Sequence, residues 1–135
     1  MSASQLVAEL KLEHKAIFQL LEEIFELGVE SRAGQDKLMA AKDLFMAHLH
    51  KEDKHLHAVL SEEEKRNEEI RETMYLMNFN LKDVTKYVEI FFNKYIDGAD
   101  MDEFECDFDM INVLLRNRMR REEKVLFREF EKLGV

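Results

Sequence analysis

The absence of proline is the feature that most restricts how this chain can fold. The chain has 135 residues, of which none is proline and only four are glycine. Proline and glycine disfavour helix interiors most strongly, and strong helix formers take their place here. The chain is 46% hydrophobic and 36% charged, as in globular and not disordered proteins. We therefore predict an all-α fold in one domain spanning residues 1–135.

Glycines and capping residues divide the chain into four helical stretches. They run from about residue 4 to 27, 35 to 60, 61 to 96 and 101 to 133. Gly28 and Gly98 stand where the first and third stretches stop. Ser61 and Glu64 have the spacing of a capping box, and the charged residues around them form either the first turns of the third stretch or a separate segment. Short connections make neighbouring stretches antiparallel, which predicts an up-down-up-down four-helix bundle.

Each stretch carries a seam of residues spaced alternately three and four apart, which places them on one face of a helix. The seams of the first and third stretches contain Val7, Leu10, His14, Ile17, Leu21 and Ile24, and then Ile70, Met74, Met77, Leu81, Val84, Val88, Phe91 and Tyr95. Those of the second and fourth contain Leu38, Ala41, Phe45, His48, Glu52, His55 and Val59, and then Phe104, Phe108, Ile111, Leu115, Arg118, Glu122 and Val125. By the same spacing His50 and His57 fall on another face, where we expect them to be solvated.

Three of the four seams become polar near the middle of the helix. The polar seam residues are His14, His48, Glu52, Arg118 and Glu122. Antiparallel folding places His14 opposite His48, and it places Arg118 beside Met77 and Leu81. One layer of the core therefore collects five polar side chains, to which the third stretch adds only apolar residues. Buried charge is costly, so these groups must pair, bind a metal or contact water.

Two interpretations of this polar layer remain open from the residues alone. Two imidazoles and two carboxylates are a sufficient donor set for one Fe(II), Mn(II) or Zn(II) ion, and His-x-x-x-Glu places two ligands on one helical face. Alternatively, Arg118 forms charge-assisted pairs with Glu52, Glu122 or both, and the histidines are neutral hydrogen-bond partners. The formal charges of the layer nearly balance without any metal.

Three segments resemble motifs of the hemerythrin-like (HHE cation-binding) family. They are "EHKAIFQLLEEI", "HLHKEDKHL" and "RMRREEKVLF", and the likeness extends over nearly the whole chain. The resemblance implies a four-helix bundle with a metal centre in its core. In that family two irons are bridged by two carboxylates and held by five histidines, and the diferrous centre binds oxygen.

The resemblance assigns ligand roles to residues of this chain. It matches His14 and His48 to the histidines of one iron, Glu52 to one bridging carboxylate, and Glu122, or alternatively Glu123, to the other. Arg118 stands where the family has a histidine in the fourth helix, and no histidine follows His57. This implies that a five-histidine di-iron centre, and oxygen carriage by the usual mechanism, are excluded. What remains is one metal with Arg118 in place of the second cation, or a decayed site whose carboxylates pair with arginine.

A second resemblance favours the metal-free alternative. The segment "LRNRMRREEKVLF" is similar to the last helix of the regulator-of-sigma-D anti-sigma factors, which have an arginine at the corresponding place. That likeness implies a bundle that regulates a partner protein by binding its basic region without a metal. The formal net charge of −9 suits a basic partner.

Charge and composition also restrict location and partners. A net charge of −9 argues against a nucleic-acid partner, and no apolar run is long enough to span a membrane. The first residues lack the pattern of a signal peptide, and the single Cys106 fits a cytoplasmic protein, where we expect its thiol to be structural. Phe92, beside the seam residue Phe91, is expected to face a neighbour, which leaves a homodimer open.

The sequence favours a metal-binding domain over an enzyme. No phosphate-binding loop and no nucleophile motif is present, so we predict a protein without catalytic turnover. The favoured function is a sensor, storage or minor redox protein that holds one iron, or manganese or zinc, through His14, His48, Glu52 and Glu122. The alternative is the metal-free regulator of a partner protein.

Overall fold

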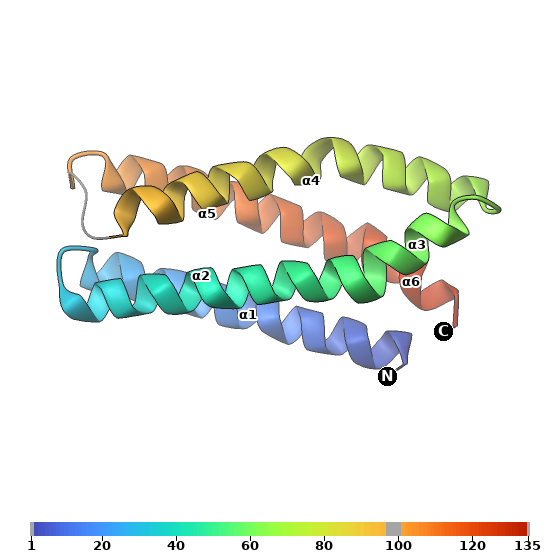
Figure 1. Cartoon of the computed structure of the whole chain (residues 1–135), viewed down its shortest axis with the longest axis horizontal. Coiled ribbons are helices and arrows are strands. Elements are labelled where there is room, and N and C mark those ends of the chain that lie inside the picture. Colours follow the sequence, from blue (N-terminus) through green and yellow to red (C-terminus); the bar gives the residue numbers. More distant parts are fainter. Residues whose placement is uncertain (1, 97–100, 135) are drawn as a thin grey trace.

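The chain folds into helical rods that lie side by side, as Figure 1 shows. The computed structural model describes residues 2–96 and 101–134, without the side chains of residues 78–82. The described elements are α1 (Ala3–Leu27), α2 (Arg32–Glu52), the π-helical turn η1 (Asp53–His57), α3 (Ala58–Glu63), α4 (Glu68–Tyr95), α5 (Phe104–Arg121), the π-helical turn η2 (Glu122–Leu126) and α6 (Phe127–Lys132). Because α2, η1 and α3 are continuous, and α5, η2 and α6 likewise, these elements form four rods. The prediction of an all-α fold is confirmed.

Consecutive rods run in opposite directions, and both chain ends lie at the same end of the bundle (Figure 1). The first rod, α1, packs against α2 and also against α5 and α6. The third rod, α4, packs against α5 and also against α2 and α3. The arrangement is therefore the predicted up-down-up-down bundle. None of the described helices is both long and apolar enough to span a membrane.

The helix boundaries follow capping side chains that the sequence indicated only in part. Gly28 ends α1 with a φ of 74°, a conformation that favours glycine. The predicted capping box of Ser61 and Glu64 is wrong, because α3 runs through Ser61 to Glu63. The third rod instead begins after Asn67, whose side chain accepts a hydrogen bond of 3.2 Å from the backbone nitrogen of Ile70. Gly98, predicted to end this rod, lies outside the described residues.

The polar layer divides the apolar core into two clusters. One cluster, away from the chain ends, contains Ile17, Leu21, Ile24, Phe45, Val88, Phe91, Phe92, Tyr95, Phe108 and Leu115 among others. The other, near the chain ends, contains Leu6, Leu10, Leu56, Leu60, Ile70, Met74, Leu126, Phe127 and Phe130 among others. Phe92 is only 2% exposed, so the prediction that it faces a neighbouring molecule is wrong. The apolar packing on both sides leaves the polar layer surrounded by core.

The two π-helical turns shift which residues face the core. His55 and Val125 were predicted to continue the seams, but both are exposed, and Val59 is only partly buried. Leu56 and Leu126 are fully buried instead. A π turn pairs residues five apart and so holds one residue more than an α turn, which rotates every later side chain relative to α-helical counting. The seam predictions after the polar layer are therefore wrong by one residue in both rods.

Candidate metal centre

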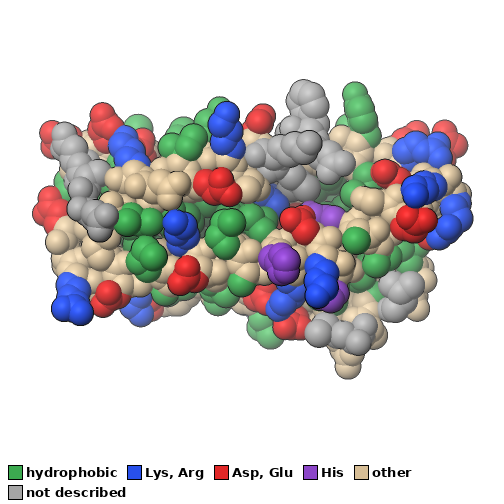
Figure 2. All heavy atoms as spheres, viewed as in Figure 1, with side chains coloured by type: hydrophobic (Ala, Val, Ile, Leu, Met, Phe, Trp, Pro, Cys, Tyr) green, Lys and Arg blue, Asp and Glu red, His purple; other side chains and the backbone are tan. Residues whose placement is uncertain are grey.

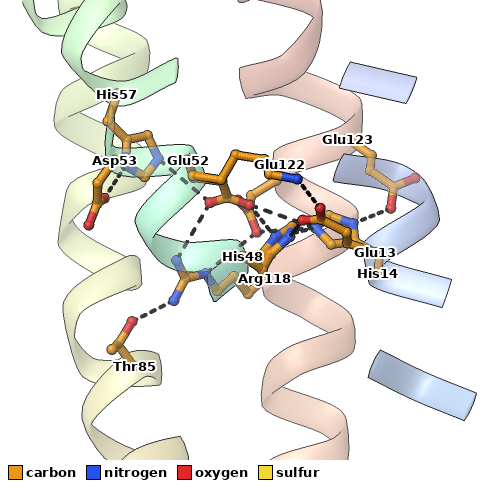
Figure 3. A network of polar contacts seen from close by, with 11 residues as sticks. Glu13, His14, His48, Glu52, Asp53, His57, Thr85, Arg118, Glu122 and Glu123 are labelled. Atoms are coloured by element: carbon orange, nitrogen blue, oxygen red, sulfur yellow. Dashed lines mark hydrogen bonds and ion pairs between the residues drawn. The ribbon is translucent and has the colours of Figure 1, made fainter. Parts of the chain in front are cut away.

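Two histidines and two carboxylates meet in the middle of the bundle (Figure 3). One ligand atom from each of His14, His48, Glu52 and Glu122 lies within 4.8 Å of those from the other three. None of the four residues is more than 2% exposed. His14 comes from α1, His48 and Glu52 come from α2, and Glu122 is the first residue of η2. The structure thus brings together the residues predicted from the sequence, and this group could hold a metal ion.

The two histidines point their Nε2 atoms at each other across 3.1 Å. Their outer Nδ1 atoms each lie 2.7 Å from a carboxylate oxygen, Glu123 Oε2 for His14 and Glu13 Oε1 for His48. A carboxylate only accepts, so each Nδ1 carries the hydrogen and donates it. A neutral imidazole then has its lone pair on Nε2. Two lone pairs that face each other at this distance require a cation between them, either a proton or a metal ion.

The carboxylates of the layer receive no hydrogen bond from the described residues. All four oxygens of Glu52 and Glu122 are buried, and no described donor is hydrogen-bonded to them. Glu52 Oε1 does touch Nε2 of His48, but that nitrogen bears a lone pair when Nδ1 is protonated, so the contact is then not a hydrogen bond. A buried oxygen left unsatisfied costs about 1–3 kcal/mol, and more when the group is charged. Both the imidazoles and the carboxylates therefore present electron pairs to one small volume.

The electrostatics of the layer favour protonation of some of its groups. Burial and the negative charge of Glu52 raise the pKa of Glu122 well above its ordinary value. Burial would also raise the pKa of Glu52, but its contacts with His14, His48 and Glu122 outweigh burial and lower that pKa. For His48, burial favours the neutral form, yet Glu52 and Glu13 outweigh it and raise the pKa. The layer therefore favours positive charge, whether as bound protons or as a metal ion.

Arg118 adds a positive charge beside the two carboxylates. Its Nε atom is 3.5 Å from Glu122 Oε1, and its Nη2 atom is 4.0 Å from Glu52 Oε2. Its Nη1 atom donates a hydrogen bond of 2.6 Å to Oγ1 of Thr85 on α4. The prediction that the third stretch adds only apolar residues is therefore wrong. Arg118 was predicted to lie beside Leu81, whose side chain is outside the described residues.

His57 approaches the layer although it was predicted to be solvated. Its Nδ1 atom is 2.8 Å from Asp53 Oδ1, and its buried Nε2 atom is 3.8 Å from Glu52 Oε2 (Figure 3). The cause is η1, because a π turn places residues five apart, such as Glu52 and His57, on one face. His50 is exposed as predicted, His55 is exposed against prediction, and Figure 2 shows histidine side chains at the surface.

Sequence reasoning missed the two carboxylates that hold the outer histidine nitrogens. Glu13 directly precedes His14 in the sequence but contacts His48. Glu123 was considered as an alternative metal ligand, yet its carboxylate contacts the Nδ1 side of His14, away from the shared volume. Lys51 contacts Glu13. Burial raises the pKa of Glu13, but the contacts with Lys51 and His48 outweigh burial and lower that pKa. The only signal for either glutamate was its place next to a predicted ligand.

The comparisons with known proteins agree with this centre. The model of one family, described as the hemerythrin HHE cation binding domain, matches residues 5–130. No curated protein and no solved structure matches the chain. The matched range extends over nearly all of the four rods and includes every residue of the polar layer, so the match concerns nearly the whole chain and not a single motif.

Proposed function

The chain belongs to the hemerythrin HHE cation-binding family, and on this premise we propose that its polar layer binds one non-haem metal ion. The proposed ligands are His14, His48, Glu52 and Glu122. Iron is the proposed metal, and manganese or zinc also suits two imidazoles and two carboxylates. The proposed role is that of a sensor, a storage protein or a minor redox protein for oxygen, nitric oxide or iron, without catalytic turnover.

One observation carries this proposal. The two Nε2 atoms lie 3.1 Å apart with their Nδ1 hydrogens already donated to carboxylates. Two nitrogens bound to one metal at about 2.1 Å and at a right angle would be about 3 Å apart. Metal-binding histidines nearly always donate their second nitrogen to a carboxylate, a carbonyl or a water. The buried carboxylate oxygens without donors complete a set of atoms that a divalent cation would satisfy.

The surrounding residues hold the ligands in place. Glu13 and Glu123 fix which nitrogen of each imidazole is protonated and how the ring is oriented. The ring of Phe127 stacks on that of His14 with 5.7 Å between centroids, which restricts its rotation. Arg118 offsets part of the negative charge of the carboxylates. A bound ferrous ion would supply an open coordination position for a small ligand such as oxygen or nitric oxide.

We propose one metal and not two. The positive guanidinium of Arg118 lies beside the same two carboxylates that would have to bridge a second ion. The chain has five histidines, of which His50 and His55 are exposed. A di-iron centre with five histidine ligands is therefore excluded, and the reversible oxygen carriage that depends on it is not proposed.

The metal-free regulator is the second candidate, because Arg118 places a positive charge beside both buried carboxylates. In that case the layer is a buried ion network, and the protein regulates a partner by docking, as the likeness to anti-sigma factors implies. Charge-assisted hydrogen bonds are about 2.7–2.9 Å long, whereas the contacts of Arg118 with Glu122 and Glu52 measure 3.5 and 4.0 Å. We prefer the metal site because Arg118 leaves the carboxylates without hydrogen bonds.

Metal analysis decides between the two candidates. Tag-free protein, purified without chelator and again after aerobic loading with Fe(II), is analysed by inductively coupled plasma mass spectrometry. We expect about one metal per chain, lost in His48→Ala and retained in the matched control His55→Ala, which changes an exposed histidine of the same rod. Metal content that is low after loading, or equal in the two variants, would overturn the metal site and leave the regulator.

A further inference from the structure

The fourth rod carries a stripe of exposed cations without acidic partners. The basic stripe consists of Arg116, Arg120, Lys124 and Arg128, which are spaced four residues apart. None of them forms an ion pair with any described residue, although the same rod holds the paired Arg118. Several other exposed cations do pair within the chain, as Lys37 with Glu23, Lys65 with Glu62, and Lys94 with Glu103 and Asp107.

This stripe runs against the overall charge of the molecule. The chain has 29 acidic and 20 basic residues, but residues 116–128 hold six of the basic residues and only two of the acidic ones. Of those two, Glu122 is buried, and Glu123 is partly exposed with its carboxylate in contact with His14. Four like charges that follow one another along a single rod create a local positive field in an otherwise acidic molecule, and such a field attracts an acidic ligand.

The stripe borders a cleft between α1 and α5. The cleft has a volume of about 250 Å³ and is lined by Phe18, Arg116, Met119, Arg120, Glu123 and Lys124. The guanidinium of Arg116 lies over the ring of Phe18 at 4.5 Å. Lys11 and Lys15 are exposed and share the face of α1 that carries Phe18, because they precede it by seven and three residues. Cations therefore flank an apolar floor from both helices.

We propose that this cleft and the basic stripe together dock an acidic segment of a partner protein. Aspartate and glutamate side chains of the segment would pair with Arg116, Arg120 and Lys124. An apolar side chain of the segment would rest on Phe18 and Met119. From Arg116 to Arg128 the rod advances about 18 Å, a length that suits an extended segment of several residues.

The size of the cleft and the charge of the chain select this occupant. Pockets that enclose small ligands measure about 300–1,000 Å³, and this smaller cleft is only one part of a longer charged face. A nucleic acid is a long polyanion that the net charge of −9 repels over the rest of the surface. A short acidic segment meets only the local positive field, which also speeds its association.

The docking surface adjoins the buried centre through one side chain. Glu123 lines the cleft with 37% of its side chain exposed, and its Oε2 atom is 2.7 Å from Nδ1 of His14. A bound segment would therefore be separated from a proposed metal ligand by a single carboxyl group. The docking itself does not require a metal, so it stands or fails independently of the proposed metal site.

Fluorescence anisotropy with a labelled acidic peptide tests the proposal. The probe is a peptide of about twelve aspartate and glutamate residues with one leucine at its centre, measured with metal-free and with iron-loaded protein. We expect saturable binding at about 20 mM salt that weakens at about 150 mM. Arg116→Glu/Arg120→Glu should weaken it by about tenfold or more. The matched control Arg32→Glu/Lys86→Glu changes the net charge equally at exposed positions outside the cleft and should retain it.

The outcomes separate the partner classes. Circular dichroism melting curves confirm that both double variants are folded, as their exposed positions lead us to expect. Absence of saturable peptide binding, or an equal loss in both variants, would overturn the proposal. Tighter binding of a single-stranded oligonucleotide of equal charge, or of vesicles containing phosphatidylserine, would overturn it in favour of a nucleic acid or a membrane surface.

Discussion

In the second rod His48 and Glu52 enter the polar layer one turn apart, and in the fourth rod Arg118 and Glu122 do the same. The two rods match well beyond these positions. Each buried residue of the second rod from Leu38 to Leu60 has a buried counterpart 70 residues later in the fourth. In both rods a π-helical turn follows directly at or after the glutamate. The backbone and packing of these two rods are therefore alike. They differ in the charge that each brings to the polar layer, because Arg118 stands where the second rod has His48.

The first and third rods repeat the comparison. Most buried residues of α1 have buried counterparts 67 residues later in α4, as Ile17 has in Val84 and Ile24 has in Phe91, whereas buried Leu6 corresponds to the partly buried Thr73. By the same spacing His14 corresponds to Leu81, whose side chain is outside the described residues. The first half thus supplies both imidazoles, and the second half supplies a glutamate and a guanidinium. The second half keeps the same helical backbone with Arg118 and Leu81 in place of histidines. It therefore shows what these positions contribute when they do not carry imidazoles.

Replacing Arg118 by leucine removes the cation that the second half contributes to the polar layer. Of the changes considered, it should lower the free energy of unfolding the most. Glu52 and Glu122 would keep their buried positions without a neighbouring cation, so the free energy of unfolding of metal-free protein should fall by about 3–5 kcal/mol. Urea unfolding followed by circular dichroism in the presence of chelator measures this change. Arg128→Leu, at an exposed position of the same rod, is the matched control. A loss as small as that of the control would show that Arg118 does not compensate the carboxylates.

Replacing His48 by alanine breaks the corresponding position of the first half, and its effect should depend on metal. A ligand present at about a thousand times its dissociation constant stabilises the folded state by about 4 kcal/mol. This metal-dependent stabilisation should disappear in His48→Ala, while the melting temperature of the metal-free protein changes much less. Calorimetric melting with and without Fe(II) under anaerobic conditions measures both. A melting temperature that rises equally with metal in the variant and the unchanged protein would contradict ligation by His48.

Removing the charge of Glu13 or Glu123 should have a smaller effect, on the affinity of the two histidines for metal. Carboxylates that hold the second nitrogen of a metal-binding histidine typically contribute 10- to 100-fold to metal affinity. We therefore expect Glu13→Gln and Glu123→Gln each to weaken metal binding by about that factor, measured by competition with a coloured chelator. Glu9→Gln, which changes a contact of Lys51 but none of a histidine, is the control. If all three variants bind alike, the outer carboxylates do not orient the imidazoles.

The sequence predicted the polar layer because its residues precede the π-helical turns. His48 with Glu52, and Arg118 with Glu122, are each four residues apart within helix that α-helical counting describes correctly. The opposition of His14 and His48 followed from the length of the connection between their helices. These predictions assumed α-helical geometry, and the second and fourth rods are α-helical up to Glu52 and Glu122.

The errors begin where that geometry ends. After η1 the seam passes to Leu56 and not to His55, and His57 turns toward Glu52. No residue type marks a π-helical turn, so α-helical counting could not find it. Thr85 was missed for another reason, because the long side chain of Arg118 reaches to it across the interface with α4. Contacts made by long side chains depend on rotamers, which spacing along the chain does not determine.

Deleting one exposed residue from each π-helical turn should lower the free energy of unfolding the least. The two deletions test whether the turns are equivalent. A π turn contains one residue more than an α turn, so removal of Lys54 or Lys124 would restore a continuous α-helix in which Leu56 and Leu126 still face the core. We expect each deletion to lower the free energy of unfolding by no more than about 1–2 kcal/mol.

The control for these deletions removes Asp43, an exposed residue within the regular helix α2. That deletion would rotate His48, Glu52 and every later side chain of the rod by about 100°, out of the core. It should therefore prevent cooperative unfolding in urea, whereas the deletions of Lys54 and Lys124 should preserve it. If deletion of Lys54 is as damaging as that of Asp43 while deletion of Lys124 is tolerated, η1 has a role that η2 lacks. The orientation of His57 toward Glu52 would then be the difference between the halves that matters.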